Sequence, residues 1–167
     1  MGSAPAVAVV DATPESPTMR RRIWKVLGLI ALAALAADHI GFVSTPSIPY
    51  RVVFYAWGTP HRGDYLSVTV HHRLIERDKP ELLTKQLACG PGDTLRFADG
   101  VHTCNGQVID HILLSKLEDG TPVPPFQYDG VIPEGQGFLL GTHPRSLDSR
   151  YLGLFPIQGA RKVWGLF

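Results

Sequence analysis

Turn-forming residues divide most of this chain into short runs. The 167 residues include 17 Gly and 14 Pro, which interrupt helices and favour turns between short strands. The intervening runs show the apolar alternation of strands, at residues 50–57, 65–71, 93–97, 107–114 and 137–141. Only Lys79–Leu87, with three leucines at helical spacing, favours a helix. We therefore expect an all-β, mainly antiparallel domain over residues 44–167.

A basic and then apolar segment precedes this domain. Residues 1–22 are rich in Ala, Pro, Ser and Thr and end in an arginine cluster, so we expect a disordered tail there. The uninterrupted apolar part of 23–43 covers only the 12 residues 26–37, the length of a signal-peptide core. Counting the flanks with a snorkelling Lys25, the segment reaches about 20 residues, enough for one span.

We therefore expect one N-terminal transmembrane helix over 23–43, with cleavage of the segment as the alternative. The basic cluster predicts a cytoplasmic N-terminus, and hence that residues 44–167 lie on the far side of the lipid bilayer.

The overall charge argues against nucleic acid as a partner. Lys and Arg total 16 against 15 Asp and Glu, a net charge of +1, which provides no basic surface for phosphates. The histidines are scattered without metal-ligand spacing, and no nucleotide or cofactor motif stands out. We expect no metal site and no cofactor.

The sequence contains two cysteines, Cys89 and Cys104. In a reducing compartment they would remain thiols, whereas outside the cytoplasm a disulfide between them is reasonable. It would close a loop of about 15 residues, for which chain entropy gives roughly 3 kcal/mol.

Two polar residues have the chemistry of a hydrolytic pair. Ser47 stands in Ser47-Ile48-Pro49, directly after the proposed anchor, where prolines restrain the backbone. A serine hydroxyl needs a neighbouring base to become a nucleophile. Lys85, which leads into a Pro-Gly-Asp turn, would act as that base if an apolar site kept its amine neutral. Taken alone, each residue has another interpretation: Ser47 as a solvated linker residue and Lys85 as a surface lysine.

A third polar segment covers residues 141–153. Asp148 and Arg150 have the spacing of an ion pair, and the Ser146 hydroxyl would orient a nearby amine. An alternative is a Ser-His-Asp arrangement with His143 and Asp148, which leaves Lys85 without a role.

In order and spacing, these segments resemble the bacterial type I signal peptidase family, and most closely its TraF-type branch from conjugative transfer systems. The residues that carry the resemblance are Ser47-Ile48-Pro49 after an anchor, Lys85 six positions before Pro91-Gly92-Asp93, and Ser146 to Gly153. Tyr50-Arg51 replaces the family's frequent Gly. Gly141-Thr142-His143 stands where general signal peptidases have Gly-Asp-Asn, which favours the TraF-type branch.

The resemblance implies a signal-peptidase-like β-domain and a role for each residue. Ser47 would be the nucleophile and Lys85 the general base, while the Thr45 hydroxyl would help to stabilise the oxyanion. Ser146 would orient the Lys85 amine, and Asp148 and Arg150 would form the supporting ion pair.

The resemblance also implies a function: a serine endopeptidase at the bacterial inner membrane, with its catalytic domain in the periplasm. Its partner would be an exported precursor polypeptide, a conjugative pilin in the TraF-type branch, with circularisation of the product in some systems. Other conjugation or secretion components are further partners to test. The alternatives are a housekeeping signal peptidase and a non-catalytic anchored β-module in a secretion or pilus assembly.

Overall fold

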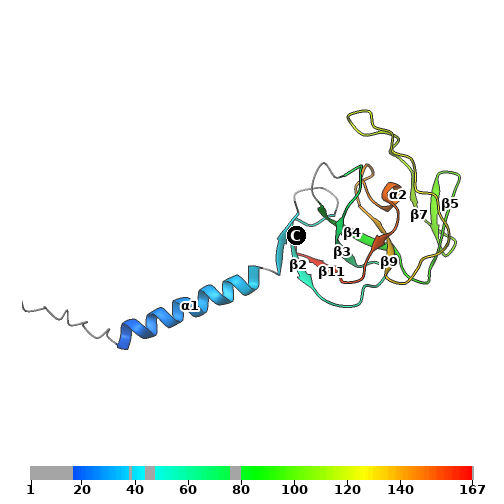
Figure 1. Ribbon diagram of the computed structural model, residues 1–167. Coiled ribbons are helices and arrows are strands. Elements are labelled where there is room, and N and C mark those ends of the chain that lie inside the picture. Colours follow the sequence, from blue (N-terminus) through cyan, green and yellow to red (C-terminus); the bar gives the residue numbers. More distant parts are fainter. Residues whose placement is uncertain (1–16, 38, 44–47, 76–79, 167) are drawn as a thin grey trace, which may run out of the picture. The chain divides into compact units, whose positions relative to one another are not determined.

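The computed structural model describes residues 17–37, 39–43, 48–75 and 80–166 (Figure 1). The chain divides after Ala37 into two units, residues 1–37 and residues 38–167. The first contains helix α1 (Pro17–Ala37), and the second contains the strands and a short helix.

Helix α1 differs in its bounds from the expected tail and the expected span. It begins at Pro17, inside the expected tail, and ends at Ala37, before strand β1 (Ile40–Phe42) in the expected span. Its first half carries Arg20, Arg21, Arg22 and Lys25, which leaves 12 apolar residues to its end, against about 20 for a bilayer. Among the described residues, no helix has both the length and the hydropathy to cross a membrane, so the expected transmembrane helix over 23–43 is not found.

The second unit is built on two antiparallel sheets. In the described residues, the larger sheet has the strand order β1, β2 (Val52–Ala56), β11 (Arg161–Gly165), β3 (Tyr65–Val70), β4 (Glu81–Cys89), β9 (Gln136–Leu140) and β10 (Phe155–Pro156). The smaller sheet has the order β7 (Gln107–His111), β6 (Val101–Cys104), β5 (Thr94–Ala98) and β8 (Asp129–Val131). The expectation of a mainly antiparallel β-domain is confirmed.

Strand β4 stands where the leucine spacing favoured a helix, so that expectation is wrong. Along its second half, Lys85, Leu87 and Cys89 are buried while the residues between them are partly exposed. This alternation has the two-residue period of a strand. The strand ends at the Pro91-Gly92 turn, where Gly92 has a positive φ of 82° that glycine adopts without strain.

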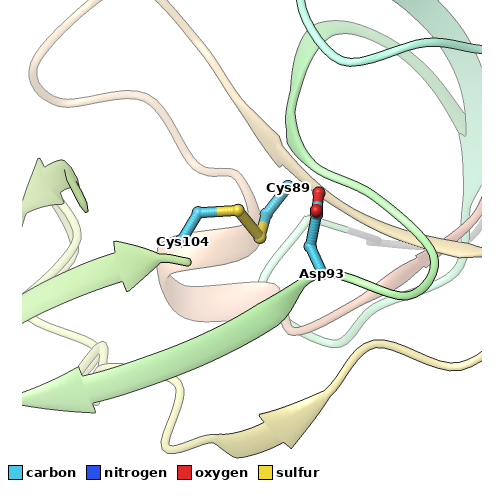
Figure 2. Close-up of side chains that lie close together, drawn as sticks. All are labelled: Cys89, Asp93 and Cys104. Carbon is cyan, nitrogen blue, oxygen red and sulfur yellow. A yellow bond between two sulfur atoms is a disulfide. The ribbon is translucent and has the colours of Figure 1, made fainter. Parts of the chain in front are cut away.

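A shared core holds the two sheets together. One buried cluster combines residues of β4, β5, β6 and β9 with Ile132, namely Cys89, Leu95, Cys104, Ile132 and Phe138. Inside it, Cys89 and Cys104 form a disulfide bond with their Cα atoms 5.8 Å apart (Figure 2). The bond therefore links the larger sheet, through β4, to the smaller sheet, through β6.

Candidate active site

Lys85 lies in the interior of the larger sheet. Its cross-strand partner on β3 is Leu66, which is fully buried, and Lys85 itself is only 2% exposed. Its Nζ donates a hydrogen bond of 2.7 Å to the Ser146 Oγ. The structure thus brings together two site residues that stand 61 positions apart in the sequence.

Burial makes the Lys85 amine a weaker base than a surface lysine. Loss of water around the charged form lowers the pKa of Lys85 from 10.5 to about 8. The charge of Asp148 acts in the opposite direction, and that of Arg150 lowers the pKa further. A lysine with this pKa supplies a neutral amine near physiological pH, which a general base requires.

Gly141 gives Ser146 the space to reach Lys85. A Cβ atom at Gly141 would lie 2.7 Å from the Ser146 Cβ and 3.2 Å from the Lys85 Nζ. Both distances are shorter than ordinary carbon contacts, so a side chain here would displace the pair. The Ser146 backbone N–H donates to the His143 carbonyl oxygen at 3.0 Å, which closes the turn that presents the hydroxyl.

Asp148 and Arg150 form a buried ion pair below this turn. Asp148 is fully buried and caps helix α2 (Ser149–Leu152), with its Oδ1 accepting from the Arg150 N–H. The Arg150 Nε donates to Asp148 Oδ1 at 2.8 Å and Nη2 donates to Oδ2 at 2.7 Å. Oδ2 also accepts from the Gly141 N–H at 2.8 Å. The pair therefore fixes both ends of the segment that carries Ser146.

Asp110 on β7 also contacts Arg150, a contact that the sequence analysis did not predict. Its Oδ2 lies 3.0 Å from the Arg150 Nε, and its Oδ1 accepts from Nη1 at 3.3 Å. Burial raises the pKa of the Asp110 carboxyl, although the Arg150 charge opposes that effect. Asp110 stands 40 positions before Arg150 in the sequence and lies in the smaller sheet, whereas Arg150 lies in helix α2. No local motif signals such a contact.

Thr45 and Ser47 lie outside the described residues, which resume at Ile48. Ile48 is 4% exposed and belongs to a buried cluster with Val53 and Val163, against which Tyr65 packs. Tyr65 on β3 pairs with Gln86, the residue after Lys85. The residue that follows Ser47 thus packs in a cluster with Tyr65, the neighbour on β3 of the residue that pairs with Lys85.

The alternative with His143 gains no support from the geometry. Both Asp148 oxygens are engaged by Arg150 and by the Gly141 N–H, and the His143 side chain is exposed. The His143 Nδ1 accepts from the Arg145 N–H at 3.2 Å.

Cys89, Asp93 and Cys104 lie close together, with their ligand atoms within 4.8 Å of one another (Figure 2). The two sulfur atoms are bonded to each other, so neither is a thiolate that would bind a metal ion. The Asp93 oxygens accept from the Gly90 N–H and from the Asn105 amide, at 2.8 and 2.7 Å. These three residues thus form a disulfide bond and a hydrogen-bonded turn next to it.

The sequence matches the model of one protein family. The family model described as signal peptidase, peptidase S26, matches residues 32–162. Among solved structures, the crystal structure of a signal peptidase I from Enterococcus faecalis V583 is similar, with 23% identity and a TM-score of 0.39. The match covers 67% of this chain and 99% of that one. No curated protein matches this sequence.

Proposed function

Because the chain belongs to the signal peptidase family, peptidase S26, we propose that it cleaves exported precursors with a Ser47/Lys85 dyad. The observation that carries the proposal is the buried Lys85 amine, held by Ser146 and with its pKa lowered to about 8. Charging a buried lysine costs free energy. A lysine at such a position is therefore explained if its neutral amine takes part in a reaction.

In the proposed reaction, the Ser47 oxygen attacks the carbonyl carbon of the scissile peptide bond while the Lys85 Nζ takes the hydroxyl proton. The negative charge on the carbonyl oxygen would be stabilised by the Thr45 hydroxyl and the Ser47 backbone N–H. Collapse of this intermediate breaks the C–N bond, and the ammonium of Lys85 returns the proton to the leaving amine. Water then attacks the acyl-enzyme, with Lys85 again as the base.

The pairing of β4 supports an extended polypeptide as the substrate. Residues 81–86 pair with β3 on one side, whereas pairing with β9 on the other side begins only at Gln86. Among the described residues, the β9-side edge of Glu81–Thr84 thus has no paired strand. Such an edge offers backbone hydrogen bonds to an added strand, and it leads directly to Lys85.

We further propose that the β-domain works outside the cytoplasm, in the periplasm of a bacterium. The support is the disulfide between Cys89 and Cys104, since disulfides persist in oxidising compartments and are rare in the cytosol.

Within the family, we propose the TraF-type branch and a pilin precursor as the substrate. The support is the Ser-x-Pro spacing at Ser47 and the Gly141-Thr142-His143 sequence before the last segment. A housekeeping role on many precursors is the alternative. Mass analysis of the product would distinguish a linear pilin from a circular one, and the range of precursors cleaved would separate the two roles.

The dyad is tested by co-expressing Ser47→Ala or Lys85→Met with a pilin precursor and measuring cleavage on gels and by mass spectrometry. We expect both variants to lose cleavage by at least about a thousandfold, since a dyad fails when either member is removed. Exposed Ser115→Ala and Lys116→Met are the matched controls and should cleave normally. Normal cleavage by Ser47→Ala or Lys85→Met would refute the dyad.

A further inference from the structure

Asp110 is a partly buried acid that none of the expected site segments includes. It lies on β7 of the smaller sheet, opposite His102 of β6, and its side chain is 17% exposed. The sheet's other arginine–aspartate pair among the described residues, Arg96 with Asp129, is 66% exposed on both side chains. An ion pair exposed to this degree contributes little to the stability of the fold. A charged acid that is largely shielded from water, in contrast, is destabilising unless an opposite charge lies beside it.

The partner of Asp110 is the guanidinium that organises the Ser146 turn. Apart from Asp110 and Asp148, this guanidinium donates to three carbonyl oxygens of that turn, those of Pro144 at 3.2 Å, His143 at 3.3 Å and Ser146 at 3.5 Å. Asp148 lies on the same segment as these carbonyls, so it moves with them. Through Asp110, the Arg150 side chain contacts β7 of the smaller sheet (Figure 1, α2 and β7).

Ser146 connects Arg150 to Lys85 through two hydrogen bonds. The Ser146 Oγ accepts from the Lys85 Nζ at 2.7 Å, and the Ser146 carbonyl faces Arg150. A shift of Arg150 toward or away from β7 therefore changes the position of the hydroxyl that holds the amine.

We propose that Asp110 is a positioning residue for the peptidase reaction: it anchors Arg150 to the smaller sheet and so sets the place and the charge surroundings of Lys85. The inference rests on the proposed function, because it assigns Asp110 a role in the chemistry of Lys85. Asp110 itself touches neither the amine nor a reacting atom.

The proposal has an electrostatic consequence. Asp110, Asp148 and Arg150 together carry one net negative charge when both acids are ionised, and loss of the Asp110 charge makes the group neutral. A less negative surrounding disfavours the charged amine, so the pKa of Lys85 should fall. Among the described residues, the titratable and charged groups around this ion-pair group include Lys85, His102, His111 and Tyr151.

Asp110→Asn in the full chain tests the proposal, because it keeps the shape and removes the charge. We expect kcat for precursor cleavage to fall at least about tenfold, as misplaced catalytic groups cost rate, while KM stays within about twofold. The midpoint of the pH–rate profile should move below the wild-type value. Asp129→Asn, which removes the exposed acid of the same sheet, should leave kcat, KM and the midpoint unchanged.

The outcomes separate the two proposals. Wild-type kcat and pH midpoint in Asp110→Asn, with Ser47→Ala inactive, would overturn the role of Asp110 and leave the dyad standing. Active Ser47→Ala would refute the dyad itself. If Asp110→Asn does not fold, Asp110→Glu decides: we expect the wild-type pH midpoint, because the charge is kept, and a lower kcat, because Arg150 is displaced. Wild-type kcat in Asp110→Glu would overturn the proposal.

Discussion

At the scale of single residues, Lys85 combines two opposed requirements. Its burial at 2% exposure lowers the pKa, whereas Asp148 raises it. A fully buried lysine without nearby acids would lose its proton so readily that it would be a poor base. The value of about 8 lies between that case and a surface lysine, near the operating pH that favours a general base.

This balance predicts the pH dependence of cleavage. Only the neutral amine acts as a base, so kcat/KM should rise about tenfold per pH unit on the acid side and level off above the pKa. The midpoint should lie at about 8. The measurement is kcat/KM for a precursor peptide across this range in buffers of constant ionic strength. A midpoint near 10.5, the ordinary pKa of a lysine, would mean that Lys85 is charged and solvated in the working enzyme.

At the scale of elements, β4 joins both halves of the domain. It pairs with β3 and β9 in the larger sheet, and Cys89 at its end is bonded to Cys104 at the end of β6. Lys85 lies four residues before that bond on the same strand. The disulfide thus fixes the smaller sheet, and Asp110 with it, to the strand that carries Lys85.

Removal of this link should destabilise the domain. The double variant Cys89→Ser/Cys104→Ser is expected to lower the free energy of unfolding by about 3 kcal/mol, because a loop with a sequence separation of 15 is no longer closed in the unfolded chain. Denaturant unfolding monitored by fluorescence measures this loss. Reduced wild-type protein is the control and should match the variant. An unfolding midpoint equal to that of the oxidised protein would show that the bond does not stabilise the fold.

Local patterns predicted some elements and could not predict others. Strands β2, β3 and β9 fall close to the ranges that apolar alternation indicated, because that pattern depends on neighbouring residues alone. Strand β4 was missed because its leucines fit a helix as well, and because hydrophobic patterns do not mark a buried lysine as interior. The Lys85–Ser146 contact followed from family resemblance, whereas Asp110 depends on how two sheets pack, which no short segment encodes.

At the scale of the whole molecule, the β-domain has core clusters of its own. The described residues of the four core clusters all lie beyond Ala37, starting with Val43. Side chains of α1 from Thr18 to Ala37 are exposed. The packing that stabilises the β-domain thus comes from its own residues.

A chain that begins at Asp38 should therefore fold by itself. We expect it to unfold cooperatively at the same denaturant concentration as the full chain, because no core cluster loses a residue. Circular dichroism and denaturant titration of both chains make the comparison, and the helical signal should decrease in the shorter one. A truncated chain without a cooperative transition would show that residues 1–37 contribute to the stability of the β-domain.

The bond between Cys89 and Cys104 also bears on how the protein matures. These are the two cysteines of the sequence, so oxidation of one molecule has a single intramolecular product. Proteins with four cysteines must choose among three pairings, and many depend on an isomerase to correct wrong ones. This chain has no wrong pairing to correct within itself. An oxidant is therefore sufficient to form the bond that links the two sheets, without an isomerase.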